Sequence, residues 1–155
     1  EFALNEIQKK HMIRGLSHIY ETSPVGYVKQ AAFWNLVVAI ETAEFPKTIR
    51  KWLGAIESKA GRRRSSNPNA PRTLDIDLLL WGDLLEKSGK SSLPHPDIAE
   101  KAFVLFPLLE INPNLVHPAL GRPLIELAAK FKDRSQKIRQ LPGNTFLNFR
   151  PVNLP

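Results

Sequence analysis

The first part of the chain alternates between helical and strand-like patterns of apolar residues. Residues 3–11 carry Leu4 and Ile7 among polar residues, which predicts a short amphipathic helix. Residues 12–21 predict a strand, and the following residues, 22–26, predict a turn because they include proline and glycine. We therefore expect the domain to open with a helix followed by a strand.

A second strand and a longer helix follow. Residues 33–42 contain a β-branched run that is apolar on both faces, which predicts a central, buried strand. Pro46 suits the first turn of a helix, and Gly61 suits its end. Between them, apolar side chains recur at the spacing of one buried helical stripe: Ile49, Trp52, Leu53, Ile56 and Ala60.

The segment 72–82 predicts a strand that carries two carboxylates on one face. Side chains alternate across a strand, so Asp75 and Asp77 point to the same side. The opposite face is aliphatic and consists of Leu74, Ile76, Leu78 and Leu80. The strand would therefore pack one face on the core and present an acidic face.

The remainder predicts two more helices. Residues 83–92 read as an exposed connection with Gly89 at its tip. A helix is expected over 97–110, kinked or ended by Pro107. A short fourth helix follows Pro123, with Leu124, Leu127, Ala128 and Phe131 on its apolar side.

Periodicity is lost from about residue 141, so we expect one domain over 1–140 and a tail or linker over 141–155. Strands and helices alternate, and several connections are long enough to be crossovers. The pattern therefore predicts an α/β or α+β domain with one mixed sheet.

Composition narrows the class of protein. The 155 residues are 43% hydrophobic and 24% charged, which suits one globular domain. With no cysteine, disulfides and thiol nucleophiles are excluded, and a cytoplasmic setting fits, or an organellar one if a native N-terminus was removed. No apolar run approaches the roughly 20 residues needed to cross a bilayer. The net charge of +7 favours an anionic partner.

The acidic pair Asp75/Asp77 has two interpretations. It is either a solvated face of an edge strand or a site for a hard divalent cation such as Mg2+, which prefers carboxylate oxygens and keeps waters and phosphate oxygens. The preceding loop, 61–72, is basic and rich in arginine. Carboxylates that hold Mg2+ and arginines that neutralise phosphate are two halves of a phosphoryl-transfer site.

The run Arg62-Arg63-Arg64 also fits a solvated surface or contact with RNA phosphates. The loop lacks aromatic residues for base stacking, and the chain lacks a Walker-type phosphate loop. His95 lies between two prolines, where it is either structural or able to bind phosphate or transfer a proton. By itself Phe33 reads as core, whereas an amide such as Asn35 at the mouth of a buried strand needs partners.

Several motifs occur together and in order. Pro71-Arg72 is followed after two residues by Asp75-x-Asp77, and Phe33-Trp34-Asn35, Gly61-Arg62-Arg63-Arg64 and Pro94-His95-Pro96 flank it. This arrangement, over about residues 4–130, resembles 6-hydroxymethyl-7,8-dihydropterin pyrophosphokinases of folate biosynthesis. The resemblance implies transfer of pyrophosphate from ATP to the pterin hydroxymethyl oxygen, with release of AMP.

The resemblance also implies roles for individual residues. Asp75 and Asp77 would hold two Mg2+ ions, and Arg62 and Arg72 would assist transfer. The ATP contacts would be Arg62, Arg64, Arg72, Leu78, Ser92, His95 and Lys101. The pterin pocket would be formed by Thr22, Val25, Phe33, Asn35 and Phe103, with Phe33 and Phe103 sandwiching the ring and Asn35 reading its amide edge.

The resemblance implies a ferredoxin-like α+β fold, a three-layer αβα sandwich with one mixed, mainly antiparallel sheet. It also implies a central strand before the first helix, and nothing in this sequence matches that strand. Lys101 stands where arginine is common, and Asn69 where some members place tryptophan. The tail resembles the exit toward a fused dihydropteroate synthase. The expected partners are small molecules, with no nucleic acid and no membrane.

Two other functions remain open from the sequence. One is a basic RNA-binding module on a ferredoxin-like sheet, which predicts exposed aromatic residues on the sheet and little role for the aspartates. The other is a truncated, catalytically inactive pyrophosphokinase domain.

Overall fold

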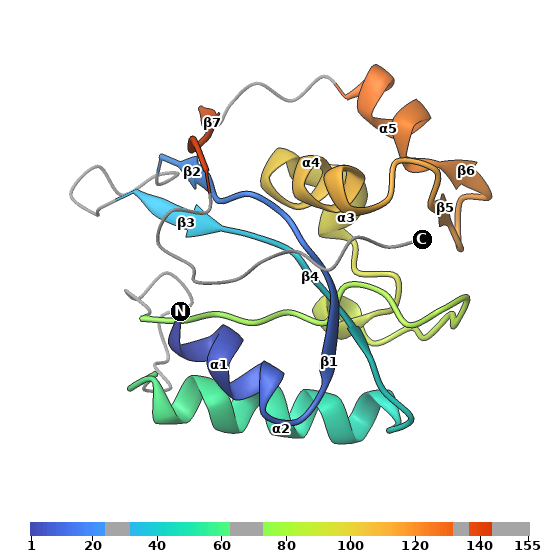
Figure 1. Cartoon of the computed structure of the whole chain (residues 1–155). Helices are drawn as coiled ribbons and strands as arrows, with labels where there is room; N and C mark the ends of the chain where they lie inside the picture. The colour runs from blue at the N-terminus through green and yellow to red at the C-terminus, as the bar shows by residue number, and fades with distance from the viewer. Residues whose placement is uncertain (24–31, 63–72, 132–136, 144–155) are drawn as a thin grey trace.

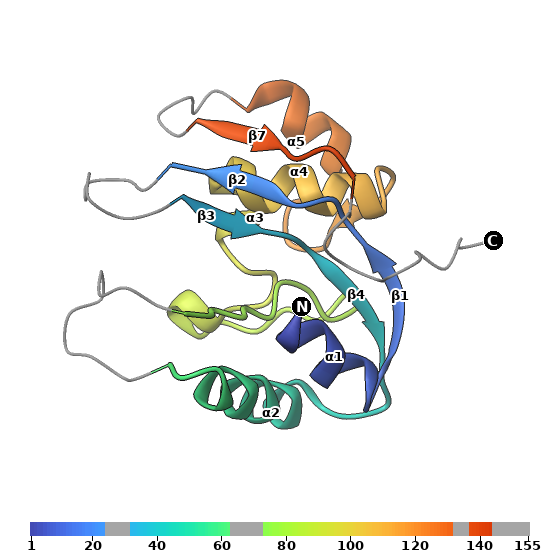
Figure 2. The ribbon, with the colours of Figure 1, turned by 60° about the vertical axis from the view of Figure 1, so that its left-hand side comes forward.

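The computed structural model describes residues 1–23, 32–62, 73–131 and 137–143 (Figure 1). Helices α1 (Phe2–Gln8) and α2 (Pro46–Lys59) lie together on one side of the strands (Figures 1 and 2). Helices α3 (Asp97–Glu100), α4 (Ala102–Ile111) and α5 (Leu124–Lys130) lie apart from them. In the part of the chain that is described, no helix is long and apolar enough to cross a membrane.

The strands form antiparallel ladders. Strand β1 (Met12–Leu16) pairs with β4 (Val38–Glu41), and β2 (Tyr20–Thr22) pairs with both β3 (Phe33–Asn35) and β7 (Ile138–Gln140). A small hairpin joins β5 (Val116–His117) to β6 (Arg122–Pro123). Helices with antiparallel sheet confirm the predicted α+β class. The ladders between named strands in the described ranges are all antiparallel rather than mixed.

Two apolar clusters face opposite sides of the extended segments. The first joins α1, β1 and α2, and Leu36, Val38 and Ile40 pack against it. The second joins α3, α4 and α5 and includes Val37. Because neighbouring side chains of a strand point to opposite faces, Val37 reaches one cluster while its neighbours reach the other. The run 36–40 therefore packs apolar side chains on both faces, as predicted, whereas the ends of the region 33–42 do not.

The predicted strand 12–21 is divided into β1 and β2. The break lies at Ser17, whose buried hydroxyl accepts a bond from the Val37 amide at 2.9 Å and donates to the His18 carbonyl at 2.8 Å. The Ser17 amide also donates to the Val37 carbonyl at 3.0 Å. A side chain thus replaces part of the regular ladder at this point, which ends one strand and allows the next to begin at Tyr20.

The predicted central position of 33–42 is not borne out. Strands β3 and β4 replace the single strand, and among the described residues each pairs along one side only. Phe33 is 41% exposed and Trp34 is 59% exposed, so the expectation that Phe33 belongs to the core is wrong. The physical reason for this exposure is that neither apolar cluster of the described residues packs over Phe33 or Trp34.

Helix α2 begins and ends where the sequence predicts. Ile49, Leu53 and Ile56 form its buried stripe, and Gly61 adopts a φ of 85° just beyond its end. The Gly61 amide donates to the Ser58 carbonyl at 3.1 Å, and the Arg62 amide donates to the Glu57 carbonyl at 3.0 Å. These two bonds form a Schellman turn, which folds Arg62 back over the last turn of the helix.

The strand predicted over 72–82 is not formed by the described residues. Residues 74–80 are extended but belong to no ladder, and an isolated bridge at Trp81 is the nearest pairing. The Leu79 carbonyl accepts a bond from the His95 amide at 2.8 Å, whereas the amides of Asp77 and Leu78 have no acceptor among the described residues. A strand needs a neighbour, and no described strand lies at ladder distance from this segment.

The helix predicted over 97–110 is divided at Lys101, which is extended with φ −123° and ψ 123°. Pro107 lies inside α4 rather than at its end, so the break precedes the proline.

The exposed connection 83–92 is confirmed and carries a short 3-10 turn, Gly89–Ser91. Helix α5 follows Pro123 as predicted. The hairpin β5–β6 and strand β7 were not predicted, and residues 144–155 of the expected tail lie outside the described ranges.

Candidate active site

The two aspartates share one face of the extended segment, as predicted. Asp75 and Asp77 are exposed, while Leu74, Ile76 and Leu78 are half-buried and pack against the first apolar cluster. This alternation arises from the period of an extended chain, even though the segment belongs to no ladder. The aliphatic face therefore anchors the segment and turns both carboxylates outward.

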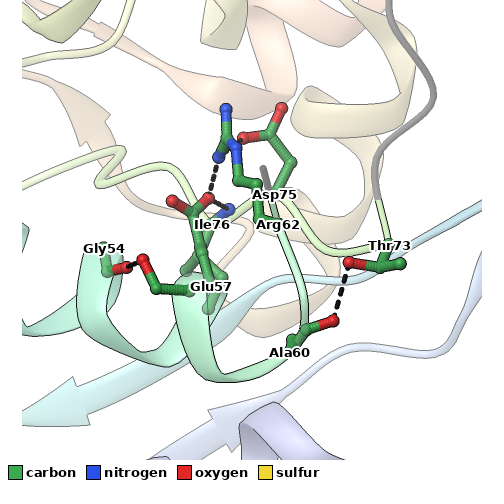
Figure 3. A network of polar contacts seen from close by, with 8 residues as sticks. Gly54, Glu57, Ala60, Arg62, Thr73, Asp75 and Ile76 are labelled. Carbon is green, nitrogen blue, oxygen red and sulfur yellow. Dashed lines mark hydrogen bonds and ion pairs between the residues drawn. The ribbon is translucent and has the colours of Figure 1, made fainter. Parts of the chain in front are cut away.

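Arg62 reaches the first of these carboxylates. Its Nη1 lies 2.5 Å from Asp75 Oδ1, and the same nitrogen contacts Glu57 Oε1 (Figure 3). The Schellman turn at the end of α2 places Arg62 over Glu57. Beside it, the Thr73 hydroxyl donates to the Ala60 carbonyl at 2.8 Å, so the two described ends of the 63–72 connection lie close together.

Glu57 is a site residue that the sequence analysis missed. Its Oε1 accepts a bond from the Ile76 amide at 2.8 Å, which ties the end of α2 to the acidic segment (Figure 3). Desolvation by burial raises the pKa of Glu57, while the Ile76 bond and the Arg62 charge oppose this shift. The only sequence signal was its position five residues before Arg62, which becomes meaningful once the turn is known.

The electrostatics of Asp77 show that the two carboxylates interact. Although part of Asp77 faces solvent, protein atoms around its carboxyl group desolvate it, and this raises its pKa. The charge of Asp75 raises the pKa further, whereas His95 and Arg62 lower it. Two carboxylates that repel each other in a partly desolvated place form a donor set that suits a cation.

His95 lies beside this pair. It is buried, and its Nδ1 accepts a bond from the Asp97 amide at 3.2 Å. The Asp97 carboxylate oxygen is 4.0 Å from the same nitrogen. When Nδ1 accepts a bond, the neutral ring carries its proton on Nε2, which can then donate to a ligand. Both the backbone and the ring of His95 are thus fixed by neighbours.

A second group of predicted residues gathers on β2 and β3. The Asn35 amide nitrogen lies 3.0 Å from the Thr22 hydroxyl and 3.2 Å from the Tyr20 carbonyl oxygen. Thr22 is buried, Asn35 is half-buried, and Phe33 is exposed. No described residue donates to the Asn35 side-chain oxygen. The sheet therefore fixes the nitrogen of the Asn35 side chain, and the side-chain oxygen can still accept a hydrogen bond from a ligand.

The other predicted site residues have no described contact with either group. Leu78 packs on the first cluster, and Phe103 packs half-buried on the second. The Ser92 hydroxyl donates to the Gly89 carbonyl at 2.7 Å, and Lys101 is half-buried between α3 and α4.

Three predicted site residues lie outside the described ranges: Val25, Arg64 and Arg72. The Arg62–Asp75 contact, with the charge effects of Asp75, His95 and Arg62 on Asp77, thus defines one group, and the hydrogen bonds of Asn35 to Thr22 and Phe33 define another.

The donor set itself is sparse. The described residues contain no group of three or more histidines, cysteines or acids that could hold a metal ion. Mg2+ is commonly held by one or two carboxylates, with waters and substrate phosphates completing its shell. The pair Asp75/Asp77 therefore fits Mg2+ that arrives with a phosphorylated ligand.

Comparison with known proteins decides the family. Residues 1–113 match the sequence model of the family described as 7,8-dihydro-6-hydroxymethylpterin-pyrophosphokinase (HPPK). The chain belongs to this family. It is 38% identical over 128 residues to the 2-amino-4-hydroxy-6-hydroxymethyldihydropteridine pyrophosphokinase of Pseudomonas aeruginosa. It is 32% identical over 124 residues to the protein of the same name from Aquifex aeolicus.

The relatives differ in how much of their own length the chain covers. The matches cover 83% and 80% of the chain and 76% and 77% of the two bacterial proteins, respectively. The chain is also 38% identical over 139 residues to the folic acid synthesis protein fol1 of Schizosaccharomyces pombe, of which it spans only 19%. It spans 18% of the Dictyostelium discoideum folic acid synthesis protein. The chain thus corresponds to most of a bacterial pyrophosphokinase and to a minor part of the longer proteins.

Proposed function

We propose that the chain transfers the pyrophosphoryl group of ATP to the hydroxymethyl oxygen of 6-hydroxymethyl-7,8-dihydropterin, releasing AMP. The observation that carries this proposal is the outward-facing pair Asp75/Asp77 with Arg62 in contact with it. Family membership and the names of the bacterial relatives support the same reaction.

Asp75 and Asp77 would hold Mg2+, with two ions expected. When bound, the metal neutralises charge on the transferred phosphoryl group and orients it. The protein's part is to hold both carboxylates on one face, through the aliphatic side chains that anchor the segment. The desolvation of Asp77 supports this role, because burying an acid without a counter-charge is costly.

The nucleotide would lie along the basic side of the site. Arg62 and Arg72 would stabilise charge during transfer, and Arg64, Ser92, His95 and Lys101 would bind phosphate or ribose oxygens, with Leu78 beside the adenine. The fixed Nδ1 bond of His95 leaves Nε2 as the donor. The net charge of +7 suits a substrate that carries a triphosphate.

The pterin would bind at β2 and β3. The uncommitted Asn35 oxygen would accept a bond from an N–H group of the ring, while Phe33 and Phe103 would stack on its faces and Thr22 and Val25 would complete the pocket. The exposure of Phe33 supports this assignment, because a stacking residue must be accessible before the ligand arrives.

The wider setting is also proposed. A ferredoxin-like three-layer sandwich would place a further strand along the side of β3 and β4 that has no partner among the described residues. A fused or associated dihydropteroate synthase is the expected partner, in keeping with fol1 relatives of which the chain spans only 19%. A cytoplasmic or organellar location would give access to ATP.

One observation favours the RNA-binding alternative, since Phe33 and Trp34 are both exposed on β3. Neighbouring residues of a strand point to opposite faces, so these two rings do not form one stacking platform. Single-stranded RNA should bind weakly and with equal affinity to the native chain and to Asp75→Asn.

The proposed function is tested by calorimetric titration with a non-hydrolysable ATP analogue. The analogue should bind the native chain in the presence of Mg2+ and much more weakly without it. Asp75→Asn and Asp77→Asn should abolish the Mg2+ effect, whereas Asp83→Asn, at an exposed position beyond the segment, should preserve it. A Mg2+ effect that survives in both site variants would reject the assignment of the metal site. Absence of any binding by the native chain would favour an inactive domain.

A further inference from the structure

Arg62 occupies one oxygen of the Asp75 carboxylate. Its Nη1 lies 2.5 Å from Asp75 Oδ1, and this contact brings a positive charge to the carboxylate. A guanidinium and a divalent cation cannot share one carboxylate oxygen without strong repulsion. A cation that binds Asp75 through Oδ1 therefore has to displace Arg62.

The charges around Arg62 favour such an exchange. Three carboxylates, those of Glu57, Asp75 and Asp77, lie in the neighbourhood of this guanidinium. Both Asp75 and Glu57 contact the Arg62 guanidinium and stabilise its charge. A divalent cation carries twice the charge of the Arg62 guanidinium and would therefore attract these carboxylates more strongly at the same distance.

Glu57 provides a place for Arg62 after the exchange. The same Nη1 contacts Glu57 Oε1, and that oxygen is fixed by the Ile76 amide at 2.8 Å. The Arg62 backbone is held by the Schellman turn at the end of α2. The guanidinium can therefore leave Asp75 by a small side-chain movement and remain paired with Glu57.

We propose that Arg62 is the resting counter-ion of the acidic pair, and that Asp75 exchanges it for a divalent cation while Glu57 retains the guanidinium at the rim of the site. This inference rests on the proposed role of Asp75 and Asp77 as cation ligands. It assigns Glu57 as a positioning residue for Arg62. Occupancy of the cation site thereby sets the direction of Arg62, which turns toward the anionic ligand only when the cation is present.

The exchange is tested by Mn2+ binding without nucleotide, measured from the electron paramagnetic resonance signal of free Mn2+. Arg62→Gln should bind Mn2+ about tenfold more tightly than the native chain, because the competing charge-assisted bond is lost. Arg14→Gln is the matched control, since Arg14 pairs with Glu41 on the exposed surface of β1 and β4. Its affinity for Mn2+ should equal that of the native chain.

Each outcome separates the exchange from the cation site. Equal or weaker binding by Arg62→Gln overturns the exchange and leaves the cation site standing. Absence of Mn2+ binding in every protein, including Arg62→Gln, also overturns the exchange, because no cation then displaces Arg62 in the absence of nucleotide; the cation site itself is tested with the ATP analogue. Adding Asp75→Asn to Arg62→Gln should remove the gain in Mn2+ affinity. If the gain persists in the double variant, Arg62 does not compete with the cation at Asp75, and the exchange is overturned.

A nuclear magnetic resonance experiment tests the role of Glu57. The side-chain Nε–H signal of Arg62 should shift when Mg2+ is added to the native chain and should remain protected from solvent. In Glu57→Gln the signal should lose this protection once Mg2+ is bound, while circular dichroism checks that the fold is kept. A signal that is unaffected by Mg2+ in the native chain would contradict the exchange.

Discussion

The side-chain amide of Asn35 donates to the Thr22 hydroxyl at 3.0 Å, across the antiparallel pair of β2 and β3. The same nitrogen lies 3.2 Å from the Tyr20 carbonyl oxygen, so the amide is oriented by the strand opposite. This arrangement sets which end of the amide is available to a ligand. It links the register of two short strands to the proposed recognition of the pterin.

Replacing Asn35 should therefore weaken pterin binding selectively. We expect Asn35→Ala to lower the affinity for 6-hydroxymethyl-7,8-dihydropterin about tenfold, the equivalent of one good hydrogen bond. Binding of the ATP analogue should be unchanged. Calorimetry of both ligands measures this, with Asn114→Ala as a control in an exposed loop. Equal loss for both ligands would show that Asn35 supports the fold rather than the pterin site.

Two glycines should respond in opposite ways to alanine. A Cβ at Gly15 would lie 2.8 Å from the Ile111 Cγ2, so Gly15→Ala should destabilise the protein by about 1–3 kcal/mol through overpacking. A Cβ at Gly54, inside α2, would meet nothing within 4 Å. Gly54→Ala should stabilise it by about 0.5–1 kcal/mol. Urea unfolding measures both, and similar effects at the two positions would contradict the packing of β1 against α4.

Tyr20 should titrate well above an ordinary phenol. Burial, followed by the charge of Glu110 and the bond to it, raises the pKa of Tyr20 from 10.0 to about 12. The folded state then holds this proton more tightly than the unfolded chain. The corresponding stability is complete below pH 10 and is lost as the pH rises toward about 12.

Ultraviolet difference titration of the native chain against Tyr20→Phe measures this pKa. Glu110→Gln should lower the midpoint, because it removes the carboxylate charge that opposes ionisation. A midpoint of 10 in the native chain, or no change in Glu110→Gln, would show that the Tyr20–Glu110 contact is absent in solution.

Hydrogen exchange should distinguish the acidic segment from a true strand. The amides of Asp77 and Leu78 have no acceptor among the described residues and should exchange at least about tenfold faster than the ladder amides of β1 and β4. The Ile76 amide, bonded to Glu57, should exchange slowly. Slow exchange at Asp77 and Leu78 would show that a neighbouring strand pairs with this segment in solution.

Local signals made part of this structure predictable. Pro46, Gly61 and the apolar stripe between them act within one helix, so the sequence alone identified α2 and its end. The period of an extended chain likewise placed Asp75 and Asp77 on one face. In both cases the deciding interactions lie within a few residues of each other.

Features that depend on distant residues could not be predicted. Whether residues 74–80 pair depends on a neighbouring strand, which no property of the segment reveals. The break at Ser17 depends on Val37, twenty residues away. Glu57 joins the site because a turn returns Arg62 to it and because its carboxylate meets the Ile76 amide. Its sequence context shows only an acid on a helix.

Phosphorus-31 magnetic resonance of the 155-residue chain with ATP, Mg2+ and 6-hydroxymethyl-7,8-dihydropterin tests the central claim most directly. Transfer of the terminal pyrophosphoryl group predicts equal amounts of AMP and a pterin diphosphate, with no ADP and no free phosphate. Asp77→Asn should form neither product. Formation of ADP, or no pterin diphosphate from a chain that binds both substrates, would contradict the assignment.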